Sequence, residues 1–212
     1  MKYDIQAKVM AFTFNQMLGD YYKKHFPEQN FKQMKRNVTR EYKAILRRTP
    51  DIGGSSLENN LVGAAYFFAV AKVIPNMTPE LMDAMITEEI SSNFMKKIHS
   101  HEKKKGTIFK DKAQNKKLCE AKASQSSLYE MGWEFTYQKG KDEFWITYTK
   151  CGVCRLAQRE KVTKYLPCMC KMDYPKYQLI GATLERSKTL AAGDDCCNFH
   201  VTRQKSNAPL YF

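Results

Sequence analysis

The feature that most constrains the fold is a change in apolar periodicity near Trp133. Before this residue, apolar side chains recur at helical spacing in segments that prolines interrupt at Pro27, Pro50 and Pro75. After it, β-branched and aromatic residues form two short runs on either side of residues 139–142, which is typical of a hairpin. The sequence therefore predicts an α+β fold, in which an N-terminal helical layer packs on a C-terminal antiparallel sheet of about four strands with crossing helices.

The helical part begins with two amphipathic segments. Apolar spacing predicts a first helix over residues 4–26, which Asp4 can cap, and a second over residues 31–47. The apolar positions of the first are Ile5, Val9, Phe12, Leu18 and Tyr22. The inner stripe expected for the second is Met34, Val38, Tyr42, Ile45 and Leu46.

Two further helices are expected before residue 100. One opens near Ser55–Ser56 and is apolar nearly all round, which indicates a buried central helix. The other begins at Thr78, whose hydroxyl can cap the helix while Pro79 occupies its first position.

A lysine-rich segment at residues 96–117 is the predicted internal boundary, since lysines far outnumber its two acids. We therefore expect a helical region over residues 1–100 and a cysteine-rich α+β region over residues 101–212, the two forming one compact unit. Within the second region, strands are expected over 134–149, 181–187 and 197–203, with a helical segment over 153–166.

The formal charge of +13 raises the question of nucleic-acid binding. Much of the excess lies in residues 96–117, where only Phe109 interrupts the lysines, so a solvated helix face is favoured over a nucleic-acid site. No apolar run is long enough to span a membrane, and the N-terminus does not resemble a signal peptide, so no membrane partner is expected. We accordingly expect a cytoplasmic protein whose cysteines are thiols, metal ligands or catalytic groups.

Six of the seven cysteines lie between Tyr148 and Val201. Cys151 and Cys154 form a CxxC directly after a predicted strand, but the following pair, Cys168 and Cys170, is CxC, a weaker zinc signal than a second CxxC. Cys151, Cys170 and Cys197 are the candidates for function; Cys119, Cys154 and Cys168 are expected to be buried small hydrophobes.

The turn from Gly193 to Cys197 is the densest reactive run. It contains Asp194 and Asp195, either of which can form a simple Asx turn with the backbone. In the strand that follows, Cys197 and Phe199 share one face, so Cys197 should point to the core. His200 lies on the other face, where a surface histidine is slightly favoured over a general base.

The stretch CMCKMDYPKYQLIGATLERSKTLAAGDDCCNFHV resembles the C-terminal signature of the L-2-amino-thiazoline-4-carboxylic acid hydrolase family. YTKC at 148–151 resembles an earlier cysteine of that family, and residues 41–61 resemble its helix–loop–helix. The residues that carry the C-terminal resemblance are Cys170, Asp173, Tyr174, Arg186, Thr189, Leu190, Gly193, Cys197 and Phe199.

The resemblance implies hydrolytic opening of a small heterocycle at an amidine-like carbon. Two mechanisms fit. In one, a thiolate of Cys197 or Cys170 attacks this carbon while Asp173 or Asp195 handles protons. In the other, Cys151, Cys170 and Cys197 hold a zinc ion whose water is the nucleophile.

Substrate binding would then fall to residues outside the thiol group. Arg186 can pair with a substrate carboxylate, Thr189 belongs to the same signature, and Asn59 and Asn60 can close the site from the helical half. The expected cofactor is none or zinc, and the expected partner is a small molecule, with homo-oligomerisation left open. A non-enzymatic small-molecule or metal sensor is the first alternative, and nucleic-acid binding through residues 96–117 is the second.

Overall fold

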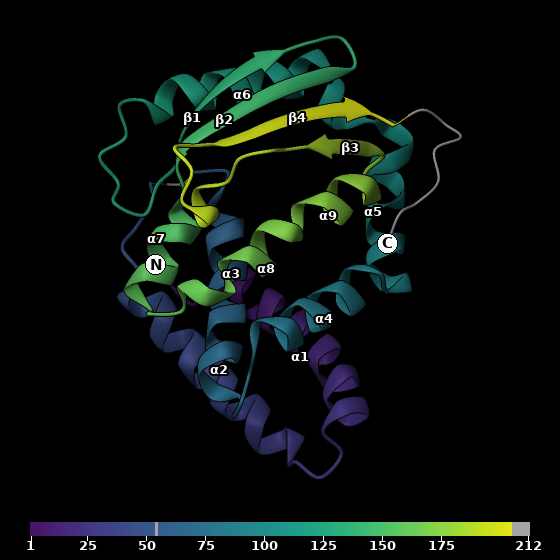
Figure 1. Cartoon of the computed structure of the whole chain (residues 1–212), viewed down its shortest axis with the longest axis vertical. Helices are drawn as coiled ribbons and strands as arrows, with labels where there is room; N and C mark the ends of the chain where they lie inside the picture. Colours follow the sequence, from purple (N-terminus) through teal and green to yellow (C-terminus); the bar gives the residue numbers. More distant parts are fainter. Residues whose placement is uncertain (54, 205–212) are drawn as a thin grey trace. The chain divides into compact units, whose positions relative to one another are not determined.

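The computed structural model describes residues 1–53 and 55–204 (Figure 1). It combines mostly N-terminal helices with a four-stranded antiparallel sheet near the C-terminus, which confirms the predicted α+β class. By contacts, the chain divides into two compact units. Unit 1 comprises residues 1–88, 129–131 and 152–168, and unit 2 comprises residues 89–128, 132–151 and 169 onward. The chain thus passes between the units several times, and a domain division at residue 100 stays a prediction.

Two helices of unit 1 start at the caps that the sequence predicts, Asp4 and Thr78, whereas the helix that begins at Glu58 lacks the predicted serine cap. Asp4 accepts a hydrogen bond from the backbone of Ala7, and Thr78 accepts one from Leu81. Its helices are α1 (Ile5–His25), α2 (Phe31–Arg48), α3 (Glu58–Val73), α4 (Pro79–Ile90, whose last residues belong to unit 2) and α7 (Gly152–Arg159). A short 3-10 turn, η2 (Thr163–Tyr165), leads to α8 (Leu166–Lys171), which starts in unit 1 and ends in unit 2.

The core of unit 1 forms around α2 and α3. The buried residues of α2 are the five that the sequence predicts, from Met34 to Leu46. Helix α3 is buried along most of its length, including Tyr66 and Phe68, as expected for a central helix.

Helix α1 buries only two of the five apolar positions that predicted it, Leu18 and Tyr22. Ile5, Val9 and Phe12 are 78%, 60% and 62% exposed, and its inner face instead carries Ala7 and Ala11. Alanines let the helix approach its neighbours closely, and the larger side chains lie on the opposite face.

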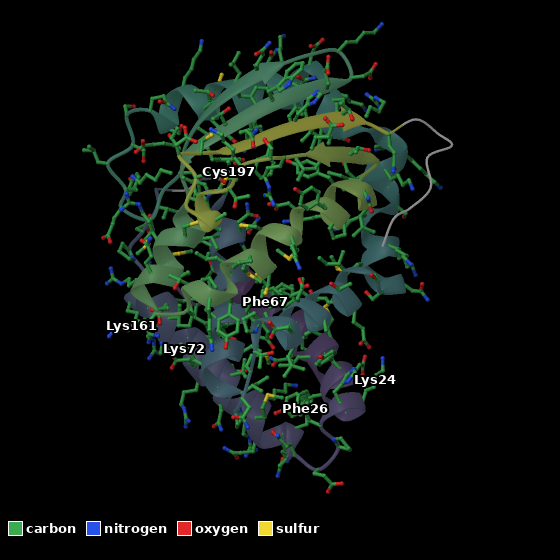
Figure 2. The ribbon with its side chains drawn as sticks, viewed as in Figure 1. Lys24, Phe26, Phe67, Lys72, Lys161 and Cys197 are labelled. Atoms are coloured by element: carbon green, nitrogen blue, oxygen red, sulfur yellow. The ribbon has the colours of Figure 1, made fainter. Side chains whose placement is uncertain are left out.

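Four charged residues form a cluster in unit 1. The carboxylate of Glu160 is buried and accepts hydrogen bonds from Arg48 Nε and Lys72 Nζ, each at 2.7 Å (Lys72 is labelled in Figure 2). Glu41 accepts a second bond from Arg48 at 2.7 Å. Burial raises the pKa of Glu160, but the hydrogen bonds from Arg48 and Lys72 outweigh it, so the pKa is lowered.

Unit 2 contains the sheet, in the order β1-β2-β4-β3 with every neighbour antiparallel. The strands are β1 (Glu134–Lys139), β2 (Glu143–Lys150), β3 (Ala182–Glu185) and β4 (Cys197–Arg203), close to the predicted ranges. The helical elements are α5 (Asn93–Lys105), η1 (Thr107–Phe109), α6 (Asp111–Ser124), α9 (Asp173–Leu179) and η3 (Leu190–Ala192).

The lysine-rich segment is helical rather than a connector. Ser92 caps α5 by accepting a bond from Met95 N, and Gly106 ends it with a positive φ of 54°. Helix α6 follows and packs on β1, where the Ser124 hydroxyl accepts a bond from Phe135 N at 3.1 Å. Residues 96–117 therefore form part of unit 2.

The two faces of the sheet differ in character. Along β4, Cys197, Phe199 and Val201 are buried, as the alternation predicts. His200 is on the opposite face, where its ring stacks on Trp145 with centroids 4.8 Å apart. The buried face is the one that carries the candidate thiol.

Candidate functional site

Cys197 occupies the first position of β4, the interior strand between β2 and β3 (Figure 2). It pairs in register with Tyr148 of β2 and is 7% exposed. The backbone N–H of Leu190 donates a hydrogen bond to its Sγ at 3.2 Å. This donor favours the thiolate form, as do amides in sites built to hold a developing negative charge.

The Leu190 amide is held in place by the turn before β4. Thr189 caps η3, since its hydroxyl accepts a bond from Ala192 N at 3.1 Å. The backbone N–H of Thr189 donates to Asp194 Oδ2 at 2.7 Å, and Gly193 takes a φ of 94° that favours glycine. Thr189 and Asp194 thus fix the turn that aims an N–H at the sulfur.

Cys151 and Cys170 reach the same region of unit 2 from other elements. Cys151 directly follows β2, and Cys170 lies near the end of α8. A charge on Cys151 or Cys197 raises the pKa of Cys170, so the three thiols lie within electrostatic range of one another. That they line one pocket stays a prediction.

Asp173 and Arg186 form an ion pair within electrostatic range of these thiols. Arg186 Nη1 donates to Asp173 Oδ2 at 2.8 Å, and Nη2 donates to the Cys170 carbonyl oxygen at 2.9 Å. The Arg186 side chain is 3% exposed, whereas Asp173 is 30% exposed. One arginine thus connects the acid to the segment that carries a thiol.

The buried guanidinium also lies between aromatic rings. Its carbon is 5.1 Å from the Tyr174 ring centroid and 4.9 Å from that of Phe199, both within cation–π distance. Within the described residues, its Nε is buried and has no hydrogen-bond partner. Arg186 is therefore rigidly placed, with one N–H not used by the protein.

Burial is the largest influence on the pKa values of Cys170, Cys197 and Asp173. It raises the pKa of Cys170 to about 12, with the Asp173 charge adding to the effect and Arg186 opposing it. Burial likewise raises the pKa of Cys197, although the Leu190 N–H opposes the shift. Burial raises the pKa of Asp173 too, despite the nearby charges of Lys176 and Arg186. Burial thus raises the pKa of both thiols and of the Asp173 carboxyl group.

Aromatic side chains complete the surroundings. The Tyr148 ring lies 5.4 Å from that of Phe199, and the Tyr177 ring lies 6.4 Å from it, both edge-on. Burial raises the pKa of Tyr148 well above its ordinary value, and the charges of Asp173, Cys151 and Cys197 add to the shift. Sequence reasoning missed Tyr148, Tyr177 and the Leu190 amide. Tyr148 is opposite Cys197 in the strand register, and this pairing marks it as a neighbour of the thiol.

Several predicted residues lie elsewhere in unit 2. His200 is on the other sheet face, between Glu143 (3.0 Å) and Glu185 (3.4 Å). Asp195 is exposed and pairs with Lys188 at 3.0 Å. The structure does not bring either beside the Cys197 thiol, because alternation along β4 and the outward turn direct them away.

Asn59 and Asn60 are exposed in the first turn of α3 and belong to unit 1, so their closing of the site stays a prediction. Cys168 also belongs to unit 1, where it is buried and its thiol donates to the Pro79 carbonyl at 3.2 Å. Cys119, expected to be buried, is instead exposed on α6.

A shared metal site requires ligands that converge on one point. Among residues 1–53 and 55–204, no three His, Cys, Asp or Glu side chains are grouped closely enough to hold a metal ion. Zinc held by Cys151, Cys170 and Cys197 remains a sequence-based prediction, and we derive no step through it.

Comparison with known proteins supplies a family. The model of the L-2-amino-thiazoline-4-carboxylic acid hydrolase family matches residues 58–201, which is more than half of the chain. The chain belongs to this family. The match includes Cys151, Cys170, Asp173, Arg186 and Cys197, and it confirms the resemblance seen in the sequence. No curated protein and no solved structure matches significantly.

Proposed function

We propose that this member of the family is a hydrolase that opens a small heterocycle such as 2-aminothiazoline-4-carboxylate, with Cys197 as nucleophile. The observation that carries the proposal is the hydrogen bond from the Leu190 N–H to Cys197 Sγ. This backbone donor favours the thiolate form of Cys197. The family name points to a hydrolase, which agrees with a nucleophile in this position.

The first step forms a bond between Cys197 Sγ and the ring carbon that is flanked by sulfur and nitrogen. Because the pKa of Cys197 is raised, its proton has to leave as the bond forms. The carboxylate of Asp173 is the acceptor we assign, since its raised pKa makes it a stronger base than an ordinary aspartate.

The ring then opens when the carbon–sulfur bond breaks, and the departing sulfur takes up the proton. Water then adds to the same carbon: one of its protons passes to the Cys197 sulfur, which leaves as a thiol, and the other ends on a nitrogen of the urea. The net change is addition of one water, giving a urea attached to an amino-acid thiol. Arg186 acts here as a positioning residue, because it holds the Asp173 carboxylate.

The test is ring-opening by the purified chain, followed as loss of ultraviolet absorbance. Cys197→Ser should lower kcat/KM by about a thousandfold or more, as expected for loss of a nucleophile. Cys154→Ser, in unit 1, is the matched control and should retain activity. Full activity of Cys197→Ser would overturn its assignment, and no turnover by folded wild-type protein would overturn the activity.

A non-catalytic binding protein is the second candidate. The raised pKa values of Cys170 and Cys197 favour it, because neutral thiols are weak nucleophiles. Calorimetry with 2-aminothiazoline-4-carboxylate separates the two: heat of binding without turnover would support a sensor. Metal analysis of the same preparation tests the zinc prediction, since stoichiometric zinc lost in Cys151→Ser would support it.

A further inference from the structure

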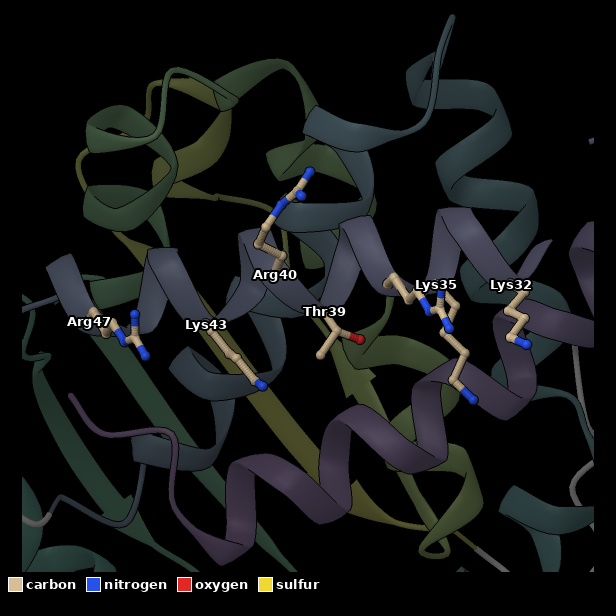
Figure 3. A pocket seen from close by; sticks show the side chains of 7 residues that line it. Lys32, Lys35, Thr39, Arg40, Lys43 and Arg47 are labelled. Atoms are coloured by element: carbon tan, nitrogen blue, oxygen red, sulfur yellow. The ribbon is translucent and has the colours of Figure 1, made fainter. Parts of the chain in front are cut away.

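Helix α2 carries a row of cations, most of which project to one side while Arg40 projects to the other (Figure 3). Five of them follow one another at spacings of three or four residues, and Lys35 lies beside Arg36. Together with Thr39 they line a hollow of about 560 Å³. The cations are Lys32, Lys35, Arg36, Arg40, Lys43 and Arg47.

Acidic side chains do not neutralise this row. Across residues 1–53 and 55–204, none of the six cations lies within 4.0 Å of a carboxylate oxygen, whereas the next residue along, Arg48, binds Glu41 and Glu160. Concentrated charge of one sign attracts an extended anionic partner.

A second unusual feature lies on the neighbouring helix. Ile5, Val9 and Phe12 of α1 are 78%, 60% and 62% exposed, and their spacing places them on one face. Large apolar side chains that gather in the open commonly mark an interaction surface.

The two rows border each other. Asn15 of α1 donates to the Thr39 hydroxyl in the hollow at 3.4 Å, and Lys43 Nζ lies 4.7 Å from the Tyr3 ring just before α1. Phe12 precedes Asn15 by three residues, one helical turn, so the apolar row lies on the surface of α1 next to the side that contacts α2. In Figure 3, α1 passes beside the cationic side chains.

We propose that this α1–α2 face binds the surface of an anionic lipid bilayer, with Ile5, Val9 and Phe12 entering the interfacial layer while the α2 cations meet lipid headgroups. An apolar row beside a cationic row is the pattern of interfacial helices. A nucleic acid would use the cations but leave the aliphatic side chains in water. A second copy of the chain would place two cationic rows together, which repel.

This proposal differs from the sequence-based expectation of no membrane partner. That expectation rested on the lack of a spanning segment, and none of the described helices is long and apolar enough to cross a bilayer. Binding at the bilayer surface requires no such segment.

The test is flotation of the purified full chain with two kinds of vesicle: phosphatidylcholine alone, and phosphatidylcholine partly replaced by phosphatidylserine. Wild-type protein should float only with the anionic vesicles. Ile5→Ser with Phe12→Ser should weaken binding about tenfold or more, because apolar burial is lost. The triple variant Lys32→Glu, Arg36→Glu, Arg47→Glu should abolish vesicle binding, since each lost cation lowers the affinity about fivefold.

A matched control changes the same charge elsewhere. Lys112→Glu, Lys116→Glu and Lys122→Glu, exposed on α6 of unit 2, should leave flotation almost unchanged. Equal loss with this control, or binding unaffected by the Ile5 and Phe12 changes, would overturn the proposal. Absence of flotation, or retention by duplex RNA but not by anionic vesicles, would also overturn it. Circular dichroism verifies that every variant is folded.

Discussion

Glu160 in unit 1 and Asp173 in unit 2 are both carboxylates bound by an arginine, yet their pKa values move in opposite directions. Glu160 receives hydrogen bonds from two cations, Arg48 and Lys72, and these outweigh the effect of burial. Asp173 has hydrogen bonds from Arg186 alone among the described residues, and burial prevails.

The comparison separates a carboxylate that stabilises the fold, Glu160, from one that can take part in chemistry, Asp173. A carboxylate whose charge is fully compensated is a weak base and holds helices together. A carboxylate whose charge is under-compensated is a stronger base and can accept a proton from a thiol. The next four predictions test this distinction, from the largest expected effect to the smallest.

Replacing Asp173 should affect activity far more than stability. Asp173→Asn preserves shape and an oxygen that can accept a bond from Arg186, but it removes the base. We expect kcat/KM for ring-opening to fall by about 10²–10⁴-fold, with little change in melting temperature. Asp195→Asn, at an exposed ion pair, is the control and should be fully active. An active Asp173→Asn enzyme would refute the proton-acceptor role.

The site thiols should react slowly in the resting protein. With a pKa raised from 9.0 to about 12, Cys170 has a thiolate population about a thousandfold below that of an ordinary thiol at neutral pH. Iodoacetamide labelling read by peptide mass spectrometry should therefore modify exposed Cys119 first. Equally fast labelling of Cys170 would show that the site is more hydrated than the structure indicates.

Replacing Glu160 should affect stability and spare the chemistry. Glu160→Gln leaves Arg48 and Lys72 without the buried charge they share, which should cost about 3 kcal/mol in the free energy of unfolding. Urea unfolding measures this cost. Glu88→Gln, in a surface pair with Lys24, is the control and should cost less than about 1 kcal/mol. A loss of turnover per folded molecule in Glu160→Gln would contradict the comparison.

The two acids should also give stability opposite pH dependences. Because the folded-state pKa of Glu160 is lowered, its contribution is present above the unfolded value of 4.5 and is lost as pH falls through the folded pKa. The advantage of wild type over Glu160→Gln should therefore shrink in acid. For Asp173 the pKa is raised, so ionisation above 3.8 costs stability as pH rises toward the folded value.

For each carboxylate, the change in the free energy of unfolding is limited to about 1.4 kcal/mol for every tenfold change in proton affinity. This pH dependence is the smallest of the expected changes. Urea unfolding across a pH series measures both. Parallel trends in the Glu160→Gln and Asp173→Asn comparisons would show that the two carboxylates do not differ.

Sequence patterns predicted the elements well where periodicity and capping agree. The inner stripe of α2, the cap at Thr78 and the β1–β2 hairpin all match the structure. They failed in the first turns of α1, where Ile5, Val9 and Phe12 are exposed, because hydrophobicity alone does not tell an inner row from an exposed one when alanines line the core side. They also missed α8 and α9, whose short cysteine- and tyrosine-rich segments lack a full helical period.

At the site, alternation along β4 correctly placed Cys197 inward, while a shared pocket for Cys151, Cys170 and Cys197 stays a prediction. The partners of these thiols were less accessible to sequence reasoning. The Leu190 N–H is a backbone group, and its direction depends on the turn that Thr189 and Asp194 fix. Spacing in sequence carries no information on where such an amide points.

The interior position of β4 has a consequence for hydrogen exchange. Strand β3 pairs only with His200–Arg203, whereas Cys197, the first residue of β4, pairs with Tyr148 of β2 alone. The amide protons of His200–Arg203 should therefore exchange only when the sheet opens as a whole. The reactive sulfur sits at the other end of the strand, next to the turn that supplies its N–H donor, where the backbone should exchange on the faster timescale of a strand end.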